Sequence, residues 1–404
     1  MVYSAFGHAG QKCSAASIVI LVGSVAKSKR FRRQLIDAVS SLTVDHPANP
    51  AAQIGPVISI PESKLLSGLT ELQAGESWLL QPRQLDDSGR LWSPGIREGV
   101  KPGSKSHMTE YFGPVISIMR ARDLDEALEI QNAVDYGLTA GIHSLDAKEV
   151  ELWIEKIQAG NLYVNRGITG AIVQRQPFGG WKRSAIGPTA KAGGPNYLLT
   201  LTEFESSESK SEFVISNKRV LQALALAASS GLTDEELAAL LSGARSDAEN
   251  LETVYSKVTD DSGLSVEKNL FRYQFAGTSL RIEGDSSDYQ QWRSVLTLLT
   301  LGKGRLSAFE VPKRLLQILR KSGIQVTIED HPTWLQKVQP GERWRVIGQV
   351  RLEGALANCE VTVFNHAPTQ SGRDELLPYF KEQAISITAH RFGNPSRMVA
   401  QLAI

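Results

Sequence analysis

The sequence has almost no cysteine and no histidine pattern suited to a metal. Its 404 residues include only Cys13 and Cys359, which lie far apart and form no CxxC motif. Neither a disulfide framework nor a cysteine zinc site is therefore indicated, and a reducing cytoplasm is the natural setting for the chain. The seven histidines show no HxxH or HExxH spacing, so we expect no histidine metal site.

An excess of charge of one sign and long apolar runs are also lacking. The 44 basic and 43 acidic residues give a formal net charge of +1, which offers no electrostatic reason to expect nucleic acid or an anionic membrane as a partner. The N-terminus has no basic region followed by an apolar run, and the most apolar early stretch, residues 18–22, is far too short to span a bilayer. The length and the 42% of hydrophobic residues instead indicate a globular cytoplasmic protein of two or three domains.

The first half alternates strand and helix patterns, which favours an α/β layer with a parallel sheet. Residues 17–22 form a β-branched apolar run typical of a buried strand. Asp123 and Asp146 each precede an apolar helical periodicity and are suited to cap a helix. Further strands are predicted at residues 114–119, 137–143 and 161–164, and a further helix at residues 27–42.

The composition changes at residues 203–212, a polar Ser/Glu-rich stretch without aliphatic residues. We interpret residues 204–212 as a linker that separates residues 1–203 from a second α/β domain, residues 213–404. Beyond the linker the patterns predict helices at residues 220–228, 234–241 and 311–321, strands at residues 324–328, 345–352 and 361–364, and either a helix or a strand at residues 294–301.

Cys13 lies among small residues in the stretch GHAGQKCSA, residues 7–15. Two interpretations are open. Because free cysteine is among the most buried residue types, Cys13 fits a core thiol. The alternative is a nucleophile, since small residues let a substrate approach the backbone closely and a short helix beginning here would favour the thiolate. Lys12 either adds to that effect or points to solvent.

The second motif, EYFGPV at residues 110–115, leads directly into a predicted strand. It is either a Gly-Pro turn with a nearby glutamate or a ligand site at the edge of the sheet, where crevices form in α/β folds. In the second case the carboxylate of Glu110 is suited to accept both hydroxyls of a ribose, and the ring of Phe112 is suited to support a nicotinamide.

The third motif is a stretch rich in glycine and arginine, residues 165–197, which follows a predicted strand. Such a composition favours a binding loop over an ordinary surface loop. The backbone N–H groups of Gly170 and Ala171 are suited to bind an anion, as in a backbone nest. Phe178 would provide an apolar wall.

In this order the three motifs closely resemble those of the aldehyde dehydrogenase superfamily. GQKCS is similar to the nucleophile motif, EYFGPV to the cofactor-ribose motif and PFGGWKRSAIG to the loop near the C-terminal end of that fold. NRGITGAIVQRQPFGG followed by GGPNYLLTL resembles the glutamate-semialdehyde (pyrroline-5-carboxylate) dehydrogenases, in particular the dehydrogenase part of the bifunctional proline-utilisation flavoproteins called PutA. The resemblance covers residues 1–203 and implies an aldehyde dehydrogenase catalytic domain truncated at its N-terminus.

Residues 213–404 are similar to the C-terminal domain of long PutA proteins, with most weight on residues 385–393. The resemblance implies a second α/β domain shaped like the nucleotide-binding domain of the dehydrogenase but without a cofactor. The stretch GKGRLS, residues 302–307, looks superficially like a dinucleotide loop. Because it follows a predicted helix where a strand is required, we expect no phosphate site there.

The resemblance also implies a chemistry. The Cys13 thiolate would attack the aldehyde of L-glutamate γ-semialdehyde, its own amide would be one donor to the oxyanion, and hydride would pass to NAD. The NAD ribose would rest on Glu110 and its nicotinamide would face Phe112, whereas FAD would belong only to a proline dehydrogenase part that is missing here. The substrate carboxylate and its aliphatic stem are assigned to Ser14, the amides of Gly170 and Ala171, and Phe178.

The family's nucleotide-binding fold, oxyanion asparagine and base glutamate do not precede Cys13, and no acidic residue does. We therefore expect a fragment with negligible NAD-dependent activity and an uncovered apolar face, completed by a missing N-terminal portion or by a homo-oligomer. Two alternatives stay open: a residual thiol esterase, or a catalytically inactive interaction and oligomerisation module. The module would use residues 196–204 as an edge strand and the C-terminal domain as a lid.

Overall fold

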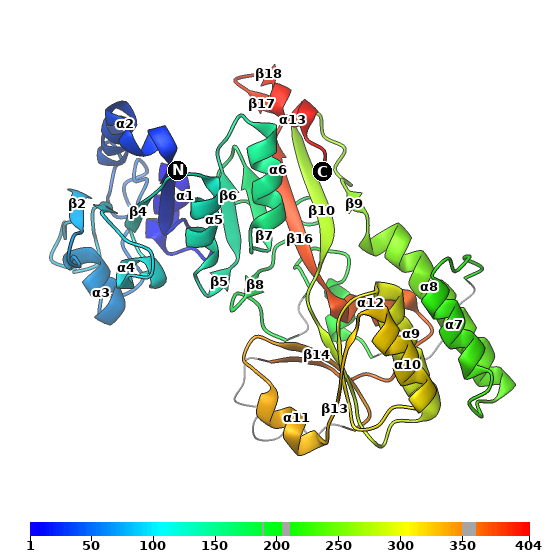
Figure 1. Cartoon of the computed structure of the whole chain (residues 1–404). Helices are drawn as coiled ribbons and strands as arrows, with labels where there is room; N and C mark the ends of the chain where they lie inside the picture. The colour runs from blue at the N-terminus through cyan, green and yellow to red at the C-terminus, as the bar shows by residue number, and fades with distance from the viewer. Residues whose placement is uncertain (188–189, 204–210, 350–360) are drawn as a thin grey trace.

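The computed structural model describes residues 1–187, 190–203, 211–349 and 361–404. Within these residues the chain forms three larger sheets with helices packed against them, as Figure 1 shows. The mixed α/β fold predicted from the sequence is confirmed. Cys359, residues 204–210 of the predicted linker and the end of the predicted strand at residues 345–352 lie outside the described residues.

The first sheet carries the strands that follow the cysteine and EYFGPV motifs. Its strands are β1 (Ile18–Val22), β2 (Ser77–Leu80), β3 (Gly95–Glu98) and β4 (Val115–Ala121). They lie in the order β1-β4-β3-β2, with β4 parallel to both neighbours and β2 antiparallel to β3. The accompanying helices are α1 (Val2–Phe6), η1 (Gly7–Gly10), η2 (Gly23–Lys27), α2 (Lys29–Ser40), α3 (Ser63–Thr70), α4 (Lys105–Met108) and α5 (Leu124–Asn132). The carboxylate of Asp123 accepts a hydrogen bond from the Glu126 amide and caps α5, as predicted.

The second sheet joins the two halves of the sequence. Its strands are β6 (Thr139–Ile142), β7 (Asn161–Val164), β9 (Val258–Thr259), β10 (Glu267–Phe275) and β16 (Phe380–Thr388), in the order β6-β7-β16-β10-β9. Strand β16 runs parallel to β7 and antiparallel to β10. This strand near the C-terminus therefore lies between β7 of the first half and β10 of the second half (Figure 1). The division at residues 204–212 stays a prediction, and it does not coincide with a break between sheets.

The core of this second sheet is likewise shared. Trp153 from α6 (Ala147–Lys156) and Leu162 from β7 are buried together with Ile385 from β16 and Met398 from α13 (Arg397–Gln401). Burial of such large apolar side chains is the dominant favourable contribution to folding. The second half of the chain therefore stabilises the strand from which the loop at residues 165–178 begins.

The third sheet is parallel throughout. Its strands are β11 (Ser279–Ile282), β12 (Arg305–Ala308), β13 (Gln325–Ile328), β14 (Arg343–Ile347) and β15 (Thr362–Phe364), in the order β13-β12-β11-β14-β15. This is the order of a doubly wound α/β sheet. The surrounding helices are α7 (Lys218–Ala227), α8 (Asp234–Asn250), η4 (Leu251–Tyr255), α9 (Asp288–Leu301), α10 (Lys313–Ser322), α11 (His331–Lys337), α12 (Gly372–Leu376) and η5 (Leu377–Tyr379).

Two stretches of uncertain type in the second half are now assigned. Residues 294–301 lie within helix α9. Gly302 ends that helix with a left-handed φ of 67°, and β12 begins at Arg305. Residues 302–307 therefore follow a helix, as predicted, and they form a helix end and a strand start instead of a strand-to-helix phosphate loop.

The remaining elements are short, and one of them overturns an expectation. They are the pairs β5 (Tyr136–Gly137) with β8 (Trp181–Lys182) and β17 (His390–Arg391) with β18 (Asn394–Pro395), and helix η3 (Tyr197–Leu201). Residues 196–204 were expected to be an edge strand in the module interpretation. That expectation is wrong over Tyr197–Leu201, because local bonds such as Leu199 N–H to Asn196 C=O close the backbone into a 3-10 helix. Among the described residues, no helix is both long and apolar enough to cross a membrane.

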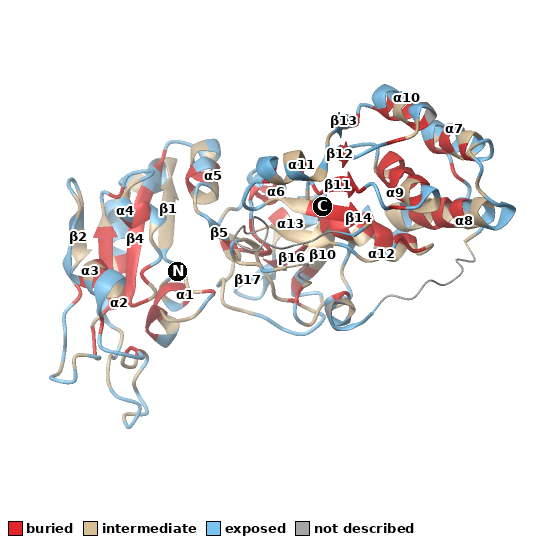
Figure 2. Ribbon diagram, turned by 90° about the horizontal axis from the view of Figure 1, so that it is seen from below, coloured by how far each residue is buried: buried red, intermediate tan, exposed pale blue. Residues whose placement is uncertain are grey.

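A cavity of about 1020 Å³ lies beside the first two sheets. It is lined by every residue of β1 and of β6, which are edge strands in the part of the chain that the structure describes. Strand β1 is found where it was predicted, but the expectation that it is buried is wrong: it is only half-buried along its whole length, in contrast to the mostly buried β4 (Figure 2). Edge strands of this kind present unpaired backbone groups and apolar side chains together.

Candidate active site

Cys13 lies in a turn between η1 and β1, and its side chain is exposed. The interpretation as a buried core thiol is therefore wrong. The expected helix start is also wrong, because η1 ends before Cys13 and the turn leads into strand β1. The turn is closed by a hydrogen bond from the Ala15 amide to the Lys12 carbonyl at 2.8 Å. The thiol is thus presented to solvent by a loop, without a helix dipole behind it.

The cysteine loop packs directly against the EYFGPV motif. Gly10 has a φ of 69°, and a Cβ atom there would lie 2.1 Å from the carbonyl oxygen of Gly113, so only glycine permits this approach. The side-chain amide of Gln11 also donates to the carbonyl of Phe112 at 3.2 Å. Two motifs that are about a hundred residues apart in the sequence therefore meet at one place.

The two predicted cofactor residues differ in their surroundings. Glu110 is exposed, and its carboxylate makes no hydrogen bond or ion pair within the described residues. Phe112 is half-buried with a φ of 55°, a strained conformation for an aromatic residue. A hollow of about 520 Å³ is lined by residues that include Gln11, Tyr111 and Phe112. Strained residues beside a hollow are typical of ligand sites.

The loop at residues 165–171 is fastened to the N-terminal elements. The ammonium of Lys12 donates to the Thr169 carbonyl at 3.1 Å, so Lys12 does not simply point to solvent. The hydroxyl of Ser4 accepts a hydrogen bond from the Ile168 amide at 3.2 Å. These contacts bring Gly170 close to the cysteine loop. No spacing in the sequence predicts them, because the partners are more than 150 residues apart.

The backbone of Gly170 is also held from the sheet. Its carbonyl accepts a hydrogen bond from the hydroxyl of Tyr163 on β7. Burial raises the pKa of Tyr163 to about 12, so the hydroxyl keeps its proton and remains a donor at any physiological pH. With its carbonyl engaged in this way, the peptide unit that links Gly170 to Ala171 has a fixed orientation. The amide of Ala171 belongs to this peptide unit, and Ala171 itself is exposed.

Ser14 has an unsatisfied hydroxyl. Its side chain is 1% exposed, and its Oγ has no hydrogen-bond partner in the described part of the chain. Buried polar groups are nearly always hydrogen-bonded, and an exception calls for an explanation such as a bound group. The position of Ser14, next to Cys13, makes a ligand the natural partner.

Phe178 is the predicted site residue that the structure ties least closely to Cys13. It is half-buried, and its backbone pairs with Ala192 through hydrogen bonds of 2.9 and 3.0 Å. The loop thus folds back on itself at Phe178, beyond the segment that Lys12 and Ser4 hold. No group of three or more His, Cys, Asp or Glu side chains within the described residues is arranged to hold a metal.

The profile of the aldehyde dehydrogenase family matches residues 1–206, and the chain belongs to this family. It is 40% identical over 200 residues to the 1-pyrroline-5-carboxylate dehydrogenases of Bacillus subtilis (strain 168) and of Geobacillus sp. (strain WCH70), which covers 49% of this chain and 38% of each relative. Among solved structures, proline utilization A (PutA) from Corynebacterium freiburgense has 41% identity and a TM-score of 0.80, over 97% of this chain and 37% of that one. The chain therefore spans a little over a third of the length of these relatives.

Proposed function

We propose that this chain is the cysteine-bearing catalytic part of an NAD-dependent L-glutamate γ-semialdehyde dehydrogenase. The observation that carries the proposal is the convergence of the three motifs: Gly10 packs on Gly113, and Lys12 reaches Thr169. The likeness to proteins named 1-pyrroline-5-carboxylate dehydrogenase and PutA supports the substrate class.

In this proposal the sulfur of Cys13 bonds to the aldehyde carbon, and the carbonyl oxygen becomes an oxyanion. The amide of Cys13 donates no hydrogen bond to another described residue, so it is free to serve this oxyanion. The unsatisfied Ser14 hydroxyl and the amides of Gly170 and Ala171 bind the substrate carboxylate, and Phe178 packs against the stem. A fixed position of the substrate relative to the thiol is the main contribution of such a loop to the rate.

The residues present fit NAD on the side of the EYFGPV motif. The exposed and unpaired carboxylate of Glu110 is free to accept the two ribose hydroxyls, and Phe112 is among the residues that line the hollow of about 520 Å³. When bound, NAD supplies the acceptor for hydride. The role of this chain's residues is then to hold the ribose and to exclude water from the nicotinamide side.

The proposal is tested by the rate at which Cys13 reacts with iodoacetamide at neutral pH, followed by peptide mass spectrometry so that Cys359 is counted separately. We expect rapid alkylation that L-glutamate slows in a saturable way, because the product acid occupies the carboxylate site and covers the thiol. Butanamide, which has no carboxylate, is the matched control and should give no protection. Equal rates with and without L-glutamate would overturn the assignment of the substrate.

A further inference from the structure

Glu267 connects the second half of the chain to the loop at residues 165–178, which we call the substrate loop. It is the first residue of β10 and is only 8% exposed. Its two carboxylate oxygens take different partners: Oε2 accepts from Nη1 of Arg166 at 2.8 Å, and Oε1 accepts from Nη2 of Arg175. Glu267 follows Arg166 and Arg175 by 101 and 92 residues, respectively.

The two arginines mark the ends of the segment that contains the carboxylate-binding amides. Arg166 lies two residues after the end of β7, and Arg175 lies in the turn that the Ile172–Gln176 bridge closes. One carboxylate therefore closes residues 166–175 into a ring, with Gly170 and Ala171 near its middle. Closing a loop in the folded chain removes alternative positions of its apex, at an entropic cost that the ion pairs offset.

Glu267 is itself held rigidly. The side-chain amide of Asn269 donates to Oε1 of Glu267 at 3.1 Å and to the hydroxyl of Ser262, also at 3.1 Å. The backbone amide of Asn269 donates to a carboxylate oxygen of Asp260 at 3.2 Å. All of these residues belong to the second half and to the stretch that includes β9 and β10. The clamp is therefore anchored to strand β10 and to the turn that precedes it.

The carboxylate of Glu267 is ionised in the clamp. Burial acts to raise the pKa of Glu267, but the hydrogen bonds from Asn269, Arg175 and Arg166 outweigh it and lower the pKa, so the carboxylate is ionised. The ionised Glu267 thus pairs with both guanidinium groups, and the clamp consists of charge-assisted hydrogen bonds.

We propose that Glu267 is a positioning residue for the substrate carboxylate: by pairing with both Arg166 and Arg175 it holds the amides of Gly170 and Ala171 at the place where they bind the acid. This role rests on the proposed function, and it assigns to the second half of the chain a direct effect on substrate affinity. Glu267 touches neither the thiol nor the reacting carbon, so it acts through the position of the loop.

The test uses the full chain and measures the concentration of L-glutamate that halves the rate of Cys13 alkylation. In Glu267→Gln we expect this concentration to rise by about fivefold or more, because the neutral amide no longer closes the loop. The alkylation rate without L-glutamate should stay unchanged, since Gly10 and Gln11 hold the cysteine loop against Gly113 and Phe112, apart from the clamp. Glu252→Gln, an exposed carboxylate on the neighbouring η4, is the matched control and should behave as the wild type.

The outcomes separate the two proposals. No protection by L-glutamate in the wild-type chain overturns the proposed function. Protection in the wild type that is equally strong in Glu267→Gln overturns only the role of Glu267. If thermal unfolding shows that Glu267→Gln does not fold, Arg175→Gln removes one ion pair from the more exposed side. It must then weaken protection in the same direction, and unaltered protection in Arg175→Gln contradicts the clamp.

Discussion

At the scale of single residues, Lys191 is a buried lysine with a strongly altered pKa. It is 2% exposed, and its ammonium donates to the side-chain oxygen of Asn161 at 2.9 Å and to the carbonyl of Gly179. Its backbone amide donates to a carboxylate oxygen of Glu382 on β16 at 2.6 Å. Burial lowers the pKa of Lys191 to about 7, and the attraction of Glu382 opposes this only in part.

This lysine makes stability depend on pH. Between pH 7 and the ordinary lysine pKa of 10.5, the unfolded chain binds a proton that the folded chain does not, so the free energy of unfolding rises with pH. Lys191 alone should raise the free energy of unfolding by about 2 kcal/mol between pH 7 and pH 9. We expect urea unfolding to show a shallower pH dependence by that amount in Lys191→Met than in the wild type. The exposed Lys218→Met is the control, and identical slopes in all three proteins would contradict the lowered pKa.

Residues also differ in how far their roles are visible in the sequence. Cys13, Glu110 and Gly170 stand out because each lies in a motif whose residue types fit one chemistry. Lys12 and Glu267 do not, because the contacts that give them a role are made across more than 90 residues of chain. The exposure of Cys13 could not be predicted either, since a lone cysteine among small residues fits a core as well as a loop.

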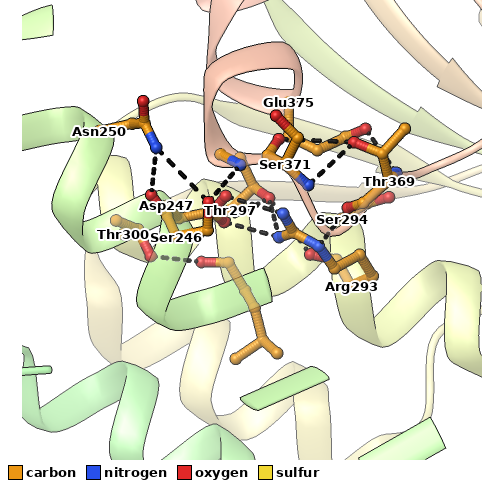
Figure 3. Close-up of polar contacts among 12 residues, drawn as sticks. Ser246, Asp247, Asn250, Arg293, Ser294, Thr297, Thr300, Thr369, Ser371 and Glu375 are labelled. Carbon is orange, nitrogen blue, oxygen red and sulfur yellow. Dashed lines mark hydrogen bonds and ion pairs between the residues drawn. The ribbon is translucent and has the colours of Figure 1, made fainter. Parts of the chain in front are cut away.

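At the scale of elements, helices α8 and α9 meet at a buried ion pair, which Figure 3 shows in detail. Arg293 on α9 donates from Nη1 and Nη2 to the two carboxylate oxygens of Asp247 on α8, at 2.6 and 2.8 Å. Thr297 donates to the same carboxylate at 2.8 Å. Gly243 makes room for the pair, because a Cβ atom there would lie 2.5 Å from Nε of Arg293. Both charged side chains are fully buried, so neither has water as an alternative partner.

Removal of one partner should therefore be costly. We expect Asp247→Ala to lower the free energy of unfolding by about 3–5 kcal/mol, because it removes the carboxylate that pairs directly with the buried Arg293 guanidinium. Replacement of both partners, Asp247→Leu with Arg293→Met, should recover most of that loss. Urea unfolding of the three proteins measures both effects. A loss below about 1 kcal/mol in the single variant would mean that water reaches the arginine.

The elements themselves were predicted well where their signals are local. The caps at Asp123 and Asp146 and the apolar runs of β1, β4 and β7 each depend on a few neighbouring residues, and all are found. The pairing of β16 with β7 was not predicted, because the sequence of neither strand indicates a partner more than 200 residues away. The same limit explains why Tyr197–Leu201 was expected to be part of an edge strand in the module interpretation: its apolar pattern does not show the local hydrogen bonds that form η3.

At the scale of the whole molecule, the sheet β6-β7-β16-β10-β9 makes the two halves one unit around the substrate loop. The loop begins at the end of β7, is fastened to the cysteine loop by Lys12 and is clamped from β10 by Glu267. The second half thus supports the site structurally, whereas its own doubly wound sheet shows no phosphate loop at residues 302–307. The proposed function requires that this arrangement places an aldehyde acid at Cys13.

The bond between the aldehyde carbon and Cys13 can be observed directly in a ¹³C NMR spectrum of the chain mixed with L-glutamate γ-semialdehyde labelled at the aldehyde carbon. Attack by the thiolate converts the carbonyl carbon to a tetrahedral carbon bonded to sulfur and oxygen. We predict a new thiohemiacetal resonance with the wild-type chain, lost in Cys13→Ser and reduced when excess L-glutamate is added. With chain and ligand at equal concentrations, a spectrum that shows only free semialdehyde and its hydrate or cyclic form would contradict the placement of the aldehyde at Cys13.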